Sequence, residues 1–246
     1  MAQFHRLILA AVIVVCSGLA QDYPRYDIRR ATDKIVVDGK LNERAWKRAN
    51  VASNFHFNWY ASGAKEQTEV RLLWDDEKLY AGFYCHDKHI SAKVIERHGP
   101  VSLDDCVEIF LSPNPEPPAA GKLPNYYGFE MNVIGTMLNF IRADWWTGGR
   151  NWEPEGVELH TSYQGLRPGK EESRDDDHWI LEVAIPFKNF SRDAKHTPPK
   201  VGDTWRLNLN RSGGQTDAQY STWSPVHTPK PNFHRPQDFG YVTFRK

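Results

Sequence analysis

The sequence has no net charge and no long run of basic residues. Its 31 Lys and Arg residues balance 31 Asp and Glu residues over 246 positions. Binding to nucleic acids needs an excess of positive charge against the phosphates, so this class of partner is excluded. Disorder is excluded too, because 13% of the residues are aromatic and nine of them are Trp. The length suits one large all-β domain or two small domains.

Long hydrophobic runs are absent beyond the N-terminus, so no membrane span is expected in the later chain. The N-terminus has a basic start, an apolar run over 7–15 and small residues before position 21. That run is shorter than the ~20 residues that cross a bilayer, so the pattern predicts a signal peptide at 1–20. We expect a secreted or periplasmic protein; a membrane anchor or a lipoprotein site at Cys16 is less favoured. A linker at 21–34 would precede one domain at 35–246.

Cysteine is scarce, with three residues in the whole chain. Removal of the signal peptide leaves Cys85 and Cys106, each at the end of an expected strand. Exported proteins meet an oxidising environment, so we predict a disulfide between these two residues. The alternative is two small, buried, unpaired side chains.

Alternation of apolar and polar residues, which is typical of strands, dominates the rest of the chain. Helix-like spacing occurs only at 42–49, and segments with Pro and Gly separate the other runs. Strands are expected at 35–38, 70–74, 79–85, 106–111, 126–133, 136–142, 157–163, 179–185, 205–210 and 239–244. This order predicts an all-β fold, an antiparallel β-sandwich of jelly-roll type with a short N-terminal helix.

Polar side chains share one face of three expected strands. In the first strand Glu108 points away from its apolar neighbours, and Glu130 with Asn132 does so in the second. Asn208 and Asn210 occupy the same kind of position in the third strand. If these strands are neighbours, the face offers the donors and acceptors that sugar hydroxyls need. The alternative is an ordinary solvated sheet face.

Aromatic residues fall into two groups. The first alternates into the expected core and comprises Trp46, Trp74, Trp179 and Trp205. The second lies in polar loops and comprises Trp145, Trp146, Trp152 and Phe233. Rings in such loops stack on the apolar faces of sugars, although a loop Trp that folds back onto the core is the alternative.

Six short motifs, in order along the chain, resemble those of family 9 carbohydrate-binding modules. They are Val36–Trp46, Val70–Asp75 with Leu79-Tyr80, Asp105–Phe110, Phe129–Asn132, Glu182–Pro186 and Pro236–Gly240. The resemblance implies a β-sandwich shared with other secreted sugar-binding and haem-binding modules, commonly with structural calcium. It also implies binding of glucan or xylan sugars, often in proteins that carry glycoside hydrolases.

The residues depart from this family at two site positions. Members with known sugar binding hold the sugar between two aromatic rings, and the matching positions here are Ser102 and Phe233. The glutamate of the family motif is kept as Glu108, whereas Glu130 stands where such members have arginine. One wall and one cationic donor are therefore missing, and we expect a loop tryptophan to replace the wall.

We therefore expect non-catalytic binding of a polysaccharide or oligosaccharide. Phe233 and the 145–152 loop would stack on the sugar. Its hydroxyls would be recognised by Glu108, Glu130, Asn132, Asn208, Asn210 and Arg235.

Three other kinds of site are alternatives, and a fourth lacks its sequence motif. A glycoside hydrolase would use Glu108 and Glu130 as paired carboxylates. A haem-binding module would need axial ligands such as Met131 or Met137. Acidic and histidine-rich turns at 86–89 and 174–178 lack the ligand spacing of calcium or zinc sites, so calcium rests on the resemblance alone. A Ser-His-Asp hydrolase is not expected, because no Gly-x-Ser-x-Gly elbow occurs.

Overall fold

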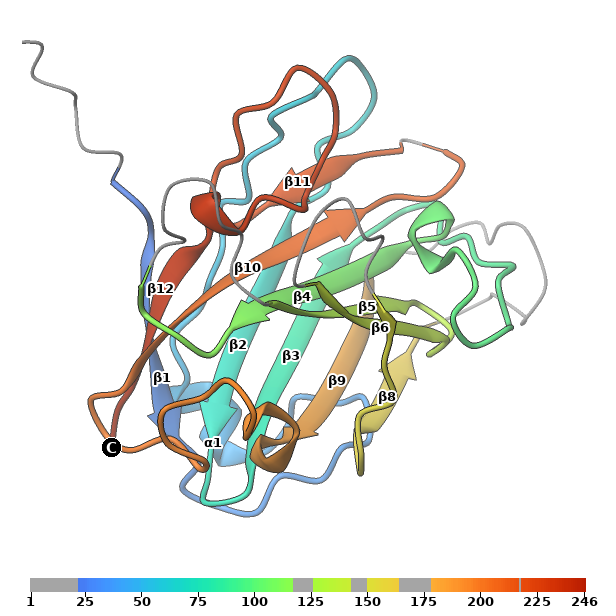
Figure 1. The fold of residues 1–246 in the computed structure, drawn as a ribbon. Helices are drawn as coiled ribbons and strands as arrows, with labels where there is room; N and C mark the ends of the chain where they lie inside the picture. Colours follow the sequence, from blue (N-terminus) through green and yellow to red (C-terminus); the bar gives the residue numbers. More distant parts are fainter. Residues whose placement is uncertain (1–21, 117–125, 143–149, 164–177, 217) are drawn as a thin grey trace, which may run out of the picture.

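The computed structural model describes residues 22–116, 126–142, 150–163, 178–216 and 218–246, and these are almost entirely β (Figure 1). The strands are β1 (Arg25–Arg30), β2 (Thr68–Trp74), β3 (Lys78–His86), β4 (Cys106–Ser112), β5 (Tyr126–Asn132), β6 (Met137–Arg142), β7 (Arg150–Asn151), β8 (Glu158–Ser162), β9 (His178–Pro186), β10 (Thr204–Ser212), β11 (Tyr220–Thr222) and β12 (Gly240–Phe244). Between them lie the helix α1 (Arg44–Arg48) and the short 3-10 helices η1 (Val101–Leu103), η3 (Phe187–Phe190) and η4 (Pro236–Asp238).

The strands form a curled sheet whose two halves stack as layers, with β10, β4 and β5 in front of β2, β3 and β9 in Figure 1. Their order is β7-β6-β5-β4-β10-β12-β1-β2-β3-β9-β8, and β11 pairs with β10. We call the half from β7 to β12, with β11, the first sheet and the half from β2 to β8 the second sheet. The β-sandwich predicted from the sequence is confirmed.

The strand β1 joins the two sheets and was missed in the sequence. Its residues 25–28 pair with β12 and its last two residues pair with β2, in both cases in parallel. Tyr26 and Ile28 alternate into the core, so the expected linker at 21–34 contains a structural strand. No strand forms at 35–38, where the backbone N–H of Asp38 instead donates to Glu182 Oε2 over 2.9 Å.

Alternation directs one side of each central strand into the space between the sheets. In β4, for example, Val107, Ile109 and Leu111 belong to this main core. Three of the four tryptophans expected inside, Trp74, Trp179 and Trp205, also lie there, and Trp46 packs in a smaller cluster under α1; all four are buried. The other side of β4 and β5 therefore faces away from the main core, and it carries the candidate site.

The predicted disulfide is wrong, because both Cys85 and Cys106 are free and buried. Cys85 on β3 belongs to the main core between the sheets. Cys106 points the other way from Val107, on the outer side of β4, so the two thiols lie on different faces. Burial raises the pKa of the Cys85 thiol to about 12 and that of Cys106 well above its ordinary value, so both thiols are inert in the folded protein.

Candidate functional site

Glu108, Glu130 and Asn210 lie side by side on the outer face of the first sheet. Glu108 on β4 is directly opposite Glu130 on β5 and directly opposite Asn210 on β10. Although this face points away from the main core, both carboxyl groups are buried, at 2% and 7% exposure. The interpretation as an ordinary solvated sheet face is therefore wrong. We call these two glutamates the acid pair.

The segment 223–239 covers this face and explains the burial. Phe233 and Phe239 from this segment pack with Phe110, Tyr126 and Phe140 of the sheet in one apolar cluster. The imidazole of His234 stacks on Phe110, with ring centroids 5.0 Å apart. The Phe140 ring fills the space above Gly128, since a Cβ at that position would lie 2.1 Å from it.

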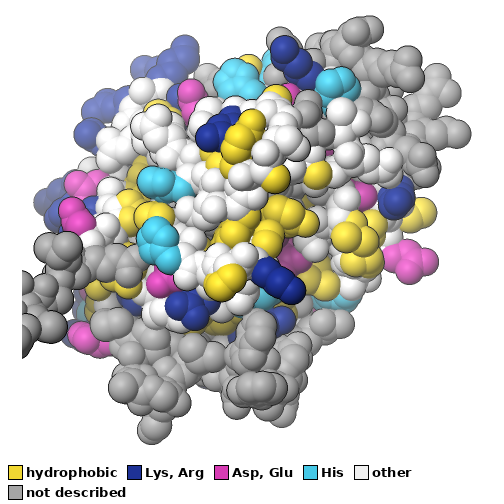
Figure 2. All heavy atoms as spheres, turned by 90° about the horizontal axis from the view of Figure 1, so that it is seen from above, with side chains coloured by type: hydrophobic (Ala, Val, Ile, Leu, Met, Phe, Trp, Pro, Cys, Tyr) yellow, Lys and Arg dark blue, Asp and Glu magenta, His cyan; other side chains and the backbone are white. Residues whose placement is uncertain are grey.

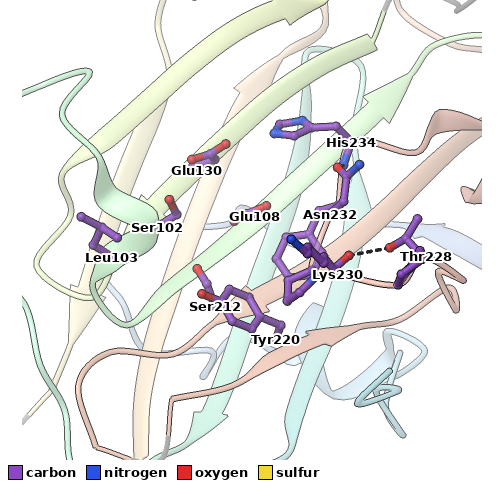
Figure 3. A pocket seen from close by; sticks show the side chains of 13 residues that line it. Ser102, Leu103, Glu108, Glu130, Ser212, Tyr220, Thr228, Lys230, Asn232 and His234 are labelled. Carbon is purple, nitrogen blue, oxygen red and sulfur yellow. Dashed lines mark hydrogen bonds between the residues drawn. The ribbon is translucent and has the colours of Figure 1, made fainter. Parts of the chain in front are cut away.

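A pocket of about 710 Å³ opens between this segment and the sheet, and its residues are shown in Figure 3. It is lined by Ser102, Leu103, Glu108, Glu130, Ser212, Tyr220, Thr228, Pro229, Lys230, Pro231, Asn232, Phe233 and His234. Ser102 and Leu103 lie on one side of the acid pair, and Tyr220 lies on another (Figure 3). Figure 2 shows hydrophobic side chains gathered on this end of the molecule.

The pocket walls offer apolar surface to a ligand. On η1, Ser102 lines the pocket at the position where the resemblance predicts an aromatic ring, and the adjacent Leu103 is 61% exposed. Tyr220 is 43% exposed, whereas Phe233 is 8% exposed and packs between Tyr220 and Trp59. Leu103 and Tyr220 therefore present more accessible surface than Phe233, the ring expected from the sequence.

Burial and mutual repulsion keep protons on the acid pair. Burial raises the pKa of Glu130 to about 7, with Arg142 opposing the shift. Burial and then the charge of Glu130 raise the pKa of Glu108 well above its ordinary value, with the hydrogen bond from Asn210 opposing. The pair therefore retains at least one proton near neutral pH. It can donate to a ligand as well as accept from it.

Polar atoms beside the acid pair remain unused in the described structure. Asn210 Nδ2 donates to Glu108 Oε2 over 3.3 Å, but the buried Oδ1 of Asn210 has no hydrogen-bond partner there. The buried Oγ of Ser212, which lines the pocket, also lacks one. Buried polar atoms usually have partners, so the Ser212 hydroxyl group at the pocket wall indicates a place for a ligand or water, whereas Asn210 does not line the pocket.

Three other residues predicted to contact a ligand are used within the fold and, like Asn210, do not line the pocket. Asn132 donates to Val94 O and Asp104 Oδ2, and its Oδ1 accepts from the backbone of the 132–136 turn. Asn208 holds Ser224 through two hydrogen bonds. Arg235 Nε pairs with Asp238 Oδ2 at 3.2 Å. These side chains position the loops around the pocket.

Trp152 does not provide the aromatic wall that is missing at Ser102. Its ring packs edge-on against Tyr127 and Phe129, which face the main core, so Trp152 lies on the opposite side of β5 from Glu130. This is the alternative in which a loop Trp folds back onto the core. Trp145 and Trp146 lie outside the described residues.

Sequence reasoning missed most of the pocket wall. Tyr220 and the residues 228–232 line the pocket, yet none was expected to do so. The signal available was the density of prolines in this part of the chain, at Pro225, Pro229, Pro231 and Pro236, which is typical of a rigid exposed loop.

The described residues contain no group of three or more His, Cys, Asp or Glu side chains arranged to hold a metal ion. In the 86–89 turn, Asp87 Oδ2 instead accepts from Arg211 Nη2 at 2.8 Å and from Trp179 Nε1 at 3.1 Å. The calcium implied by the resemblance remains an expectation from the sequence, and most of the acidic turn at 174–178 lies outside the described residues.

Comparison with known proteins agrees with this fold. The family model described as carbohydrate-binding family 9 matches residues 38–244. A search of curated proteins gave no significant match. A candidate carbohydrate-binding protein from Bacteroides uniformis has a similar structure, with a TM-score of 0.75 and 20% identity over 91% of this chain and 100% of that chain.

Two structures of a family 9 module from Caldicellulosiruptor kristjanssonii are also similar. The complex with cellotriose has a TM-score of 0.60 and 15% identity over 90% of this chain and 94% of that chain. The complex with glucose has a TM-score of 0.57 and 16% identity over 89% and 95%. Because the family model spans most of the sequence, this chain belongs to carbohydrate-binding family 9.

Proposed function

We propose that this family 9 carbohydrate-binding module holds an oligosaccharide or polysaccharide in the pocket above Glu108 and Glu130, without cleaving it. The observation that carries the proposal is the buried acid pair, which faces an open pocket with apolar walls. The sugar complexes of the Caldicellulosiruptor kristjanssonii module support it through the shared fold.

The pocket matches the two kinds of surface that a sugar presents. The C–H face of a ring would lie against Tyr220 and Leu103, which are the accessible apolar walls. Hydroxyl groups would exchange hydrogen bonds with the acid pair and with the unused Ser212 Oγ. Asn232 lines the same pocket and offers an amide to hydroxyls at its edge.

Geometry favours binding over hydrolysis. Glu108 and Glu130 are directly opposite on neighbouring antiparallel strands and project to the same side of the sheet. Residues paired in this way have Cβ atoms about 4.5–5.5 Å apart, which is close to the carboxyl separation of a retaining glycosidase, so the distance alone does not decide. A glycosidase instead places its two carboxyl groups on either side of the scissile bond. Both glutamates lie on one floor, so they reach a ligand from the same direction.

Localisation outside the cytoplasm is also part of the proposal. It is supported by the signal-peptide pattern at 1–20, which lies outside the described residues. In the described part of the chain, no helix is long and apolar enough to cross a membrane. A module of this kind would act beside glycoside hydrolases that degrade the same carbohydrate.

A glycan panel tests the proposal. Wild type, Tyr220→Ala and Leu103→Ala would be screened for binding and titrated with each bound glycan. Loss of a ring–sugar contact of about 1–1.5 kcal/mol weakens binding by roughly tenfold, which we expect for Tyr220→Ala. Ile95→Ala is the matched control for Leu103→Ala, because Ile95 is 65% exposed and lies outside the pocket.

Product analysis after long incubation distinguishes binding from cleavage, because a binding module leaves the glycan intact. Unchanged affinity in both pocket variants would refute this location of the site. Absence of binding to every glycan would refute the function.

A further inference from the structure

Glu130 and Glu182 are both buried, but in the described part of the chain only Glu182 has hydrogen-bond partners. Glu182 accepts hydrogen bonds from the backbone of Asp38 and Gly39 and from Trp46 Nε1, at 2.9–3.1 Å. Glu130 is 7% exposed, yet among the described residues it forms no hydrogen bond and no ion pair. Its carboxyl group lines the pocket beside Glu108 (Figure 3). Its oxygens are not among the fully buried atoms that lack a partner, so they reach the open pocket and are available to a ligand or water there.

The charges around Glu130 leave the pocket floor acidic. Glu108 lies directly opposite on β4, and Arg142 at the end of β6 opposes the rise in the pKa of Glu130 without forming an ion pair with it in the described structure. Lys230 is exposed at the pocket wall and pairs with neither glutamate among the described residues. Burial lowers the pKa of His234 to about 3, so this neighbour is neutral.

We propose that the pocket takes a sugar bearing a protonated amine, as in β-1,4-linked glucosamine, with the ammonium group held between Glu130 and Glu108. This assignment rests on the proposed function and names the class of its ligand. An ammonium group brings three donors and one positive charge, which are what two adjacent carboxyl groups lack. A buried carboxylate is stable only when it is paired, and the bound amine supplies that pair.

The rest of the pocket fits the remainder of such a ring. Ser212 Oγ, buried and without a partner in the described structure, lies on the same floor and suits a hydroxyl group. Tyr220 and Leu103 offer apolar surface to the ring itself. Acetylation of the amine would remove the charge and two of its three donors, so the N-acetyl sugar would leave the acid pair unsatisfied.

Calorimetric titration of three tetrasaccharides at pH 7 tests the inference. The ligands are β-1,4-linked tetraglucosamine, its fully N-acetylated form and cellotetraose, which share chain length and linkage. We expect tetraglucosamine to bind about 10- to 100-fold more tightly than the two neutral ligands, the range contributed by one charge-assisted hydrogen bond. Its advantage should shrink at high salt.

Two variants tie the preference to the acid pair. Glu130→Gln removes the charge while keeping the shape, and should reduce the advantage of tetraglucosamine to about one- to threefold; Glu108→Gln provides a second, independent test. Glu96→Gln is the matched control, because Glu96 is exposed and lies outside the pocket.

The outcomes separate this inference from the proposed function. Tight binding of cellotetraose that Tyr220→Ala weakens, with no preference for the amine, would refute the inference and leave the function intact. An amine preference that survives in both glutamine variants would also refute it. Absence of binding to all three ligands and to the glycan panel would refute both.

Discussion

Replacement of Glu130 by glutamine should make the protein more stable, and more so as the pH rises. The ordinary pKa of this carboxyl group is 4.5, and burial raises it to about 7 in the folded protein. Between these values the unfolded chain loses the proton while the folded chain keeps it, so the stability of the wild type falls as pH increases. Above pH 7 Glu130 is ionised in both states, and the loss of stability does not increase further.

The size of the effect follows from the pKa difference. At 1.36 kcal/mol per pKa unit, the rise from 4.5 to about 7 corresponds to about 3 kcal/mol of lost stability. Glutamine cannot ionise and therefore does not incur this loss. It also removes the repulsion that raises the pKa of Glu108, which changes stability in the same direction.

Urea unfolding of wild type and Glu130→Gln at pH 4, 6 and 8 measures this difference. The other titrating groups are common to both proteins, so their contributions to the pH dependence of the unfolding free energy largely cancel in the difference. The stability of the variant relative to wild type should increase by about 3 kcal/mol from pH 4 to pH 8. Glu96→Gln, at an exposed position, should follow the wild type at each pH. A pH-independent difference for Glu130→Gln would refute the raised pKa of Glu130 in the folded protein.

Two substitutions and one chemical modification test the fold. Gly128→Ala places a Cβ 2.1 Å from the Phe140 ring and should cost about 1–3 kcal/mol in urea unfolding; no loss would contradict the close packing of this ring. Arg211→Met breaks buried ion pairs and should cost about 3–5 kcal/mol, whereas a neutral result would mean that these pairs contribute nothing. Alkylation of unfolded, unreduced protein should modify both Cys85 and Cys106 in peptide mass spectra; protection of both would restore the disulfide.

The sequence was sufficient to predict the sandwich and the position of its acidic face. Alternation is local, so Glu108 could be assigned to the side opposite Val107 without knowledge of any partner strand. The register between β4 and β5 decides which residue of β5 lies opposite Glu108. In this register it is Glu130. A slip of one residue would have turned Glu130 into the core, and the burial of Phe129 and Met131 disfavours that slip.

The pocket wall could not be predicted in the same way, because its parts come from distant segments. Leu103, Tyr220 and Phe233 meet only after the 223–239 segment folds over β4 and β5. Trp152 is the opposite case, a residue that was predicted to contact the ligand and instead packs against the core. A tryptophan in a polar loop has the same local signature whether it faces a ligand or the core, and here Tyr127 and Phe129 provided a core site for it.

The acid pair links stability to binding in this pocket. The fold leaves Glu130 unpartnered among the described residues, so ionisation of this group costs stability that a glutamine would not cost. The same free energy is recovered when a ligand supplies the missing donors and charge, because the ligand then stabilises the ionised form. A protonated amine recovers more of it than a hydroxyl group, since it pairs with the carboxylate as well as donating to it. The greater the burial of the pair, the larger the expected discrimination between a cationic sugar and a neutral sugar of the same shape.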